Sequence, residues 1–367
     1  MRSSGVQVSS ISRRQFATGL LCLAGCQLVP GSGKAAPAPF RSESILDQFQ
    51  PYEPRGVASG TVSLWGHGSF KRDFMGRLVN RWISEFHQRQ PGVDFEYEMY
   101  GTASAIGALY TGAGNLAILG EEISPAAKKA FEREKGYSPT GVMVATGSLD
   151  VNYFDYAHMV FVHRDNPVRK LSLGQLEAVF GTECRSGCKP IRAWGELGAQ
   201  GKWHAQAIQP YGWETDEDFG LFFRERVLGD SHRWNPSIRE FAHLKYPDGT
   251  QYDHGQRILD ALAQDRYGIA ISNIRYQNPS VRPLDLGWHD GGPYYAPTPE
   301  TLISQQYPLT RIIPAYIDRT PGQSLASGLT EFVRFMLSRE GQRALIEESG
   351  YLPIDPRLAI RQQAELV

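Results

Sequence analysis

The sequence predicts an α/β protein built as two lobes. From about residue 60, β-like and helix-like segments alternate with short loops, and a second alternating block runs from about 170 to 275. The chain has 367 residues, of which 41% are hydrophobic and 11% aromatic, so it is long enough for two or three domains with cores of their own. Strand and helix in alternation indicate mostly parallel sheets covered by helices.

In the first block, the spacing of the apolar residues predicts the helices and strands. Phe74, Leu78, Trp82 and Phe86 recur every four residues, as on the buried face of a helix, whereas residues 93–100 alternate as a strand does. The strands expected here are 61–66, 93–100, 116–120 and 158–162, and the helices expected are 74–86, a short one after the turn 101–104 that ends at Tyr110, and 125–135 opened by Pro125.

The second block and the C-terminal segment follow the same rules. An apolar strand over 267–271 closes the second block. Residues 329–346 carry an apolar stripe at helical spacing, which predicts that this segment is helical.

The N-terminus has the features of an export signal. Arg13 and Arg14 precede the apolar run 16–24, which is shorter than the roughly 20 residues that a membrane-spanning helix needs. Residues 12–16 resemble the twin-arginine signal, and 23–26 resemble a bacterial lipobox ending at Cys26. We therefore expect removal of 1–25, lipidation of Cys26 and a tether over 26–56. The alternative is cleavage within 34–38, which would release the protein from the membrane.

Export would also determine which cysteines remain in the mature protein and whether their surroundings are oxidising. Cys22 would leave with the signal, so Cys184 and Cys188 would remain in an oxidising compartment, where a short-loop disulfide is expected. Zinc is the alternative, although no second cysteine pair exists and the nearest downstream histidine is His204.

Charge and motifs narrow the function classes. The chain has 38 basic and 39 acidic residues, and loss of the signal with its three arginines leaves a formal charge of −4, which argues against a dedicated nucleic-acid binder. No nucleophile elbow, phosphate-binding loop of the Walker type or zinc-protease motif occurs. We expect no enzyme, no cofactor and no metal; His67 beside a glycine turn, Asp253-His254 and His289-Asp290 are weak exceptions.

Several segments resemble one family. They are 171–181 followed by 194–198, the strand 265–270, and above all 331–342 followed by 350–354. They resemble the bacterial phosphate-binding proteins of ABC importers, in the type II periplasmic binding-protein superfamily. The resemblance implies two lobes, each a mixed, mostly parallel sheet flanked by helices, with a ligand cleft between them: lobe one at 57–163 plus 302–367, and lobe two at 164–301.

The resemblance also implies how a ligand is held. Backbone N–H groups at helix N-termini and hydroxyl groups would bind a small oxyanion. The candidate ligand-binding residues at the corresponding positions are Ser69, Phe70, Thr102, Ala103, Ser104, Glu121, Gly212, Trp213 and Thr215, of which Glu121 and Trp213 depart from the family pattern. For Ser69 and Thr102 a plain helix-capping role is the alternative.

The second lobe departs from the family pattern. The family's arginine is missing from 209–216, and Glu214 and Asp216 add negative charge there. Either Glu121 or Glu122 would be the acid that accepts a hydrogen bond from protonated phosphate; the alternative is that both are solvated acids at the start of a helix. Trp213, Tyr211, Tyr100 and the aromatic cluster 153–156 would suit a ligand with an organic face; the alternative is that they are ordinary aromatic residues of the core or the lobe surface.

Two functions therefore stay open. The first is a periplasmic or cell-surface lipoprotein, monomeric, that binds phosphate or a similar anion for an inner-membrane ABC permease. The second is a sensing or scaffold lipoprotein of the same fold that has lost phosphate binding and recognises another ligand. Neither involves nucleic acid.

Overall fold

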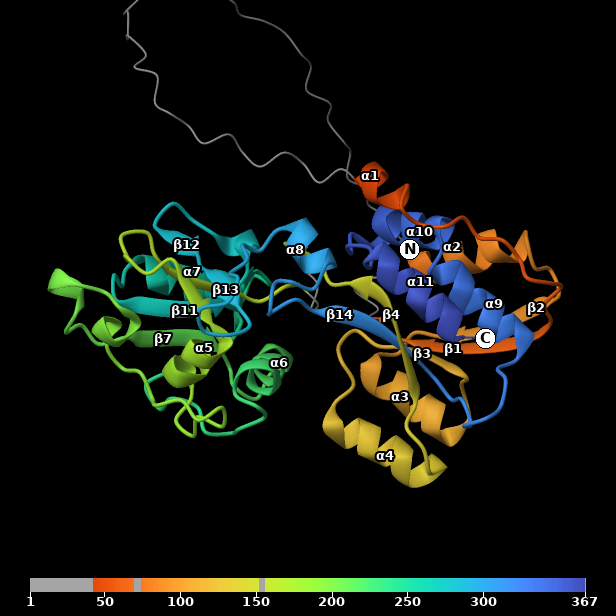
Figure 1. Cartoon of the computed structure of the whole chain (residues 1–367), viewed down its shortest axis with the longest axis horizontal. Helices are drawn as coiled ribbons and strands as arrows, with labels where there is room; N and C mark the ends of the chain where they lie inside the picture. Colours follow the sequence, from red (N-terminus) through yellow and green to blue (C-terminus); the bar gives the residue numbers. More distant parts are fainter. Residues whose placement is uncertain (1–41, 69–73, 152–155, 367) are drawn as a thin grey trace, which may run out of the picture. The chain divides into compact units, whose positions relative to one another are not determined.

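Two five-stranded sheets organise the chain (Figure 1). The computed structural model describes residues 42–68, 74–151 and 156–366, all of which lie in one unit, Arg41–Val367. Within these ranges no helix has the length and apolar character needed to cross a membrane. The expectations for 1–41, including Cys26, and those for Ser69 and Phe70 fall outside the described residues.

The first sheet has the strand order β2-β1-β3-β14-β4. Its strands are β1 (Gly60–Gly66), β2 (Val93–Glu98), β3 (Leu116–Ile118), β4 (Thr140–Thr146) and β14 (Ile312–Ile317). β1 pairs in parallel with β2 and β3, whereas β14 runs antiparallel to β3 and β4. The last strand to be made therefore sits in the interior of the sheet.

Helices cover both faces of this sheet (Figure 1). On one face lie α3 (Thr102–Thr111) and α4 (Pro125–Lys135), and on the other lie α2 (Phe74–His87), α9 (Ser327–Met336), α10 (Arg339–Ser349) and α11 (Pro356–Glu365). Leu78, Trp82 and Phe86 of α2 are fully buried in the core, and the Trp82 indole donates to the carbonyl of Gly341 over 2.8 Å. A short helix, α1 (Ser42–Leu46), precedes β1.

The second sheet has the order β12-β5-β11-β7-β8. Its strands are β5 (Met159–His163), β7 (Gln209–Trp213), β8 (Arg239–Phe241), β11 (Gly268–Ser272) and β12 (Val281–Pro283). β11 and β8 flank β7 in parallel, and β5 runs antiparallel to β11 and β12.

Helices and short elements accompany this sheet. The helices are α5 (Leu173–Phe180), α6 (Asp218–Val227), α7 (His254–Ala263) and α8 (Pro299–Ile303), with 3₁₀ turns η1 (Trp194–Leu197), η2 (Gly201–Trp203) and η3 (Ile274–Tyr276). Two small ladders pair β6 (Lys170–Ser172) with β13 (Asp285–Gly287), and β9 (Leu244–Lys245) with β10 (Gln251–Tyr252).

The expected fold class is confirmed, since helices flank two mixed sheets. Parallel pairs make up half of each sheet, because β14, the last strand of the first sheet, and β5, the first strand of the second, each run antiparallel to both neighbours. The helix predicted from Pro125 is present, with Ser124 accepting a hydrogen bond from the Ala127 N–H.

The segment 329–346 is helical as predicted, except at Leu337 and Ser338. The segment forms α9 and α10, because Ser338 caps a new helix by accepting a hydrogen bond from the Gly341 N–H. A β-carbon on Gly341 would lie 2.2 Å from the Phe335 carbonyl oxygen, so the turn between the helices requires glycine at this position.

Two further expectations concern the disulfide and the boundaries of the lobes. Cys184 and Cys188 form the expected disulfide. The lobe boundaries stay a prediction; β5, at the end of the range assigned to lobe one, pairs within the second sheet.

Candidate functional site

The carboxyl ends of β1 and β3 meet the start of α3 in the first sheet. We call residues 66–68, 101–104 and 120–122 the first edge. Gly101 precedes α3 with φ 115°, a conformation that favours glycine, and no side chain caps this helix. The N–H groups of the first helical turn have no partner within a helix, so they are available to an acceptor from outside.

Thr102 is the hydroxyl residue best placed on the first edge. Its Oγ1 accepts a hydrogen bond from the Gly120 N–H over 3.1 Å, which leaves the hydroxyl hydrogen to donate elsewhere. Thr102 thus links the end of β3 to the start of α3 and keeps a donor at an uncapped helix terminus.

The neighbouring predicted residues differ from Thr102. The Ser104 hydroxyl donates to the Gly101 carbonyl over 2.8 Å, so its hydrogen is already used to hold the turn. Ala103 is exposed and offers only its backbone.

Glycine is required where the first edge is tightest. A β-carbon on Gly120 would lie 2.7 Å from His67 Nδ1. Burial lowers the pKa of His67 to about 4, and its Nε2 is enclosed without a hydrogen-bond partner among the described residues. His67 is therefore neutral at neutral pH and supplies no positive charge to an anion.

Acidic side chains and one arginine complete the first edge. Arg311, 2% exposed, places Nε 3.2 Å from Glu122 Oε2 and its guanidinium carbon 4.4 Å from the centre of the Phe222 ring. Burial, followed by the charges of Asp218, Glu122 and Glu225, raises the pKa of Glu121, while Arg311 opposes the shift. Glu122 rather than Glu121 is thus the acid that pairs with the arginine.

The turn from β7 into α6 is the corresponding feature of the second sheet. We call residues 212–218 the second edge. Trp213 is 2% exposed, and its indole N–H is buried without a hydrogen-bond partner in the described ranges. The Trp213 ring stacks on Phe219 at 4.8 Å and lies 4.6 Å from the ring of His158.

His158 and Trp213 belong to a buried aromatic cluster. His158 is fully buried, and neither ring nitrogen hydrogen-bonds to a described residue. Burial, with the charges of Arg311 and His254, holds the pKa of His158 well below its ordinary value. The other rings of the cluster are Tyr156, Phe219 and Phe222. The segment in which the family resemblance implies an arginine therefore contributes a packed aromatic cluster, and the cation beside this cluster is Arg311, over the ring of Phe222.

The remainder of the second edge is acidic. Thr215 directs its N–H to Glu240 Oε2 over 3.0 Å, and its hydroxyl lies 3.5 Å from the same oxygen. Burial, with a hydrogen bond and charge from Glu214, raises the pKa of Glu217 to about 7. Glu217 occupies the N-cap position of α6 without a side-chain capping bond, and Asp218 follows in the first turn. A dianion would meet carboxylates here rather than free donors.

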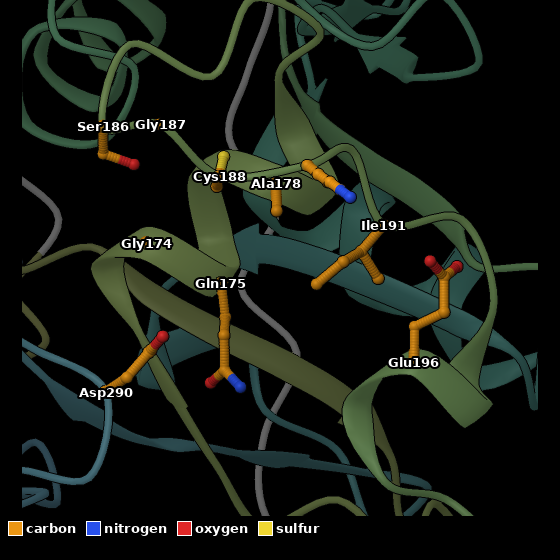
Figure 2. Close-up of a pocket in the computed structure, with 10 residues that line it drawn as sticks. Gly174, Gln175, Ala178, Ser186, Gly187, Cys188, Ile191, Glu196 and Asp290 are labelled. Atoms are coloured by element: carbon orange, nitrogen blue, oxygen red, sulfur yellow. The ribbon is translucent and has the colours of Figure 1, made fainter.

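A separate hollow of about 520 Å³ lies beside the disulfide (Figure 2). Its lining residues are Gly174, Gln175, Ala178, Ser186, Gly187, Cys188, Lys189, Ile191, Glu196 and Asp290. Asp290 is held by a hydrogen bond from the Ser172 hydroxyl. None of the predicted ligand residues lines this hollow, so it is not the predicted site.

The structure thus distributes the predicted residues over two edges. Thr102, Ala103, Ser104 and Glu121 lie on the first edge, and Gly212, Trp213 and Thr215 lie on the second. Gly212 is buried, and a β-carbon there would approach Ile238 to 3.2 Å.

The sequence interpretation missed Arg311. The sequence does contain a signal for it, because an arginine stands directly before the apolar strand 312–317 and a charge next to a buried strand needs a partner. The partner, Glu122, is 189 residues away in sequence, and no local pattern identifies it.

Tyr211 and Tyr100 are also separated. The hydroxyl of Tyr211, a buried residue, donates to Asp265 over 2.9 Å, and Tyr100 is 58% exposed with its ring 6.1 Å from that of Trp65. They do not form one aromatic surface with Trp213.

The structure has the two helix-flanked sheets, with strand-to-helix turns at their ends, that the resemblance implies. Comparison with known proteins agrees. The chain is 27% identical over 327 residues to the phosphate-binding protein PstS of Pseudomonas aeruginosa, in two strains, covering 88% of this chain and 92% of the relative. The resemblance predicted from sequence is confirmed.

A solved structure shows the same fold. The crystal structure of PstS from Borrelia burgdorferi superposes with a TM-score of 0.54 at 14% identity, covering 81% of this chain and 99% of that chain. No protein-family model matches the sequence.

Proposed function

We propose that the protein binds phosphate or a related small oxyanion outside the cytoplasm and delivers it to an ABC importer. The observation that carries the proposal is the uncapped start of α3, where Thr102 keeps a hydroxyl donor beside the free N–H groups. An anion at a helix N-terminus gains hydrogen bonds and a favourable dipole interaction. The similarity to PstS, a protein named for phosphate binding, supports the same ligand class.

In this proposal the first edge provides most of the binding. Ser69 and Phe70 would contribute from the turn after β1, and the N–H groups of residues 102–104 from α3. Glu121 would accept a hydrogen bond from the P–OH group of a protonated phosphate, a donor that sulfate lacks at neutral pH. Ser104 would act by holding the turn, since its hydroxyl already donates to Gly101.

The second edge would contribute less. Thr215 would have to exchange its contacts with Glu240 for a ligand, and Trp213 would need the aromatic cluster to open. Gly212 would offer only its backbone. The lobes of the proposed binding protein are 57–163 plus 302–367, and 164–301.

Calorimetry tests the ligand class. Phosphate, sulfate, molybdate and a phosphonate are titrated into the purified protein, and at least one is expected to bind at micromolar or lower concentration. The double variant Ser69→Ala/Thr102→Ala should weaken that binding by several kcal/mol through loss of charge-assisted hydrogen bonds. Absence of heat with all four anions would reject the oxyanion proposal.

Export and anchoring form a separate part of the proposal. The signal over 1–25 would direct folded export by the twin-arginine route, and Cys26 would carry the lipid. Cys26→Ser should abolish the lipid mass and release the protein from the membrane fraction. Arg13→Lys with Arg14→Lys should retain the precursor in the cytoplasm. A soluble mature form that begins near residue 35 would instead support later cleavage.

The second candidate is a sensing or scaffold lipoprotein of the same fold. The acidic turn 214–218 and the buried Trp213 favour it, because they disfavour an anion and leave no cation in the place of the missing arginine. It predicts no binding of the four anions and lobe closure, seen by small-angle scattering, with an organic ligand instead.

A further inference from the structure

Three potential metal ligands converge beside α7, away from the first edge. One ligand atom from each of His243, Asp253 and His254 lies within 4.8 Å of the other two. His243 precedes the β9–β10 ladder, and Asp253 and His254 follow it at the start of α7. The hairpin thus brings together residues that are ten positions apart in sequence.

His254 supplies the observation that points to a ligand. The residue is 3% exposed, and its Nδ1 is buried without a hydrogen-bond partner among the described residues. A buried polar atom normally has such a partner, because an unmet one costs the free energy of its desolvation. A metal ion would satisfy this nitrogen.

The carboxylates around His254 are placed to join it. Asp253 caps α7 through Oδ1, which accepts from the Gly255 N–H over 2.9 Å, and its Oδ2 lies 3.8 Å from His243 Nδ1. Glu217 Oε2 lies 3.5 Å from His254 Nδ1. Two imidazoles and one or two carboxylates form a donor set that suits a first-row divalent ion such as Zn²⁺.

One side chain must turn for all donors to face one ion. The rings of His243 and His254 stack with centres 3.8 Å apart and planes at 19°, so their in-plane lone pairs do not yet converge. His243 retains 30% of its side-chain exposure, whereas His254 is enclosed. Rotation of His243 out of the stack is therefore the smaller adjustment, and it would exchange the hydrogen bond that His243 Nδ1 accepts from the His254 N–H over 3.2 Å for the ion.

We propose that His243, Asp253 and His254 form a Zn²⁺-binding site, with Glu217 as the fourth protein ligand. A bound ion would join the β9–β10 hairpin, the start of α7 and the start of α6 in one coordination sphere. The site uses none of the residues proposed to contact the anion, so it stands or falls independently of the proposed function.

The test is a calorimetric titration of ZnCl₂ into the full-length protein, first stripped with a chelator and kept in a buffer free of phosphate. One Zn²⁺ per chain should bind at micromolar or lower concentration, and the melting temperature should rise with free Zn²⁺. Loss of an outer-shell partner typically weakens metal binding by about 10-fold to 100-fold. His254→Ala and His243→Ala each remove a direct ligand, so each should weaken Zn²⁺ binding by at least that much. Glu217→Gln should weaken it less.

The matched control is His289→Ala, because His289 is exposed and also stands beside an aspartate, Asp290. This variant should bind Zn²⁺ as the unaltered protein does. His243→Ala keeps the test valid if His254→Ala fails to fold, since His243 is partly exposed. Absence of Zn²⁺ binding, or equal binding by the His243, His254 and His289 variants, would overturn the proposal. Because no anion is present, either outcome leaves the oxyanion proposal to its own titration.

Discussion

The first and second edges occupy comparable turns but carry opposite chemistry. At the first edge, α3 starts at Gly101 with no capping side chain, and the Thr102 hydroxyl can still donate. At the second edge, Trp213 is packed among aromatic rings, and the start of α6 carries Glu217 and Asp218. The turn before α3 keeps hydrogen-bond donors available, whereas the turn before α6 buries an aromatic ring and places acidic side chains at the start of the helix.

This difference shows that the fold places two helix termini but does not make both of them anion sites. The dipole of α6 is the same in kind as that of α3, yet carboxylates at its start offset it. In the proposed function, a mildly acidic chain must therefore rely on local donors to bind an anion, and the candidate donors are those of the first edge. Four variants test the contrast, from the largest expected effect to the smallest.

Trp213→Ala should have the largest effect. Removing a fully packed indole should lower the free energy of unfolding by about 3–5 kcal/mol. Denaturant unfolding measures the loss, and Trp288→Ala is the matched control, because Trp288 is 38% exposed and should cost less than about 1 kcal/mol. Equal, small losses in both variants would mean that Trp213 is free to meet a ligand, and the contrast between the edges would fail.

Arg311→Met should rank second, at about 3 kcal/mol of lost stability. It leaves Glu122 without its cation, and breaking a buried pair from one side costs more than replacing both partners. The double variant Arg311→Met/Glu122→Met should therefore be more stable than the single one. If the double variant is the less stable of the two, the pair stabilises the fold outright and this account of the first edge is wrong.

Thr102→Ala should weaken oxyanion binding by about 1.5–3 kcal/mol, which corresponds to roughly tenfold to a hundredfold in affinity. Thr102→Ser keeps the hydroxyl and should bind nearly as well as the unaltered protein. Calorimetry with the best anion of the panel measures both variants. Thr215→Ala, on the second edge, should have a smaller effect, because its hydroxyl and N–H already face Glu240. A larger loss from Thr215→Ala would reverse the ranking of the edges.

Glu217→Gln should have the smallest effect and a defined pH dependence. The pKa of Glu217 is raised to about 7, so between about 4.3 and 7 the folded state holds a proton that the unfolded state has released. The stabilisation from this proton is complete below the unfolded pKa and is lost as pH rises through 7. The variant should therefore gain up to about 1 kcal/mol at pH 8, a modest gain because Glu217 is 39% exposed, and none below pH 4.

Thermal melts across pH 4–8 measure this effect, with Glu134→Gln, an exposed acid of α4, as control. A gain that is larger at pH 5 than at pH 8 would contradict the sign.

The fold could be predicted where local spacing determines it. The apolar period of α2 and the Ser124-Pro125 start of α4 are visible in sequence and are present in the structure. The division at Ser338 escaped prediction because the apolar stripe continues across it, and only the capping bond to Gly341 ends the helix. Periodicity reports which face is buried, not where a helix stops.

The candidate site could be predicted less fully, since it depends on residues distant in sequence. Thr102 was identified from its place before a helix, but its bond to Gly120 arises only when β3 lies beside the start of α3. For Trp213, residue type did not reveal how deeply β7 is buried. The Arg311–Glu122 pair joins segments brought together by β14.

The place of β14 has a consequence for the order of folding. β3 and β4 are made early but do not pair with each other; β14, residues 312–317, fills the gap between them. Until almost the whole chain has left the ribosome, both strands present an unpaired edge, which is prone to association with other chains. The first sheet therefore closes late, through contacts of high sequence separation, and we expect slow folding and a need for protection of the nascent chain.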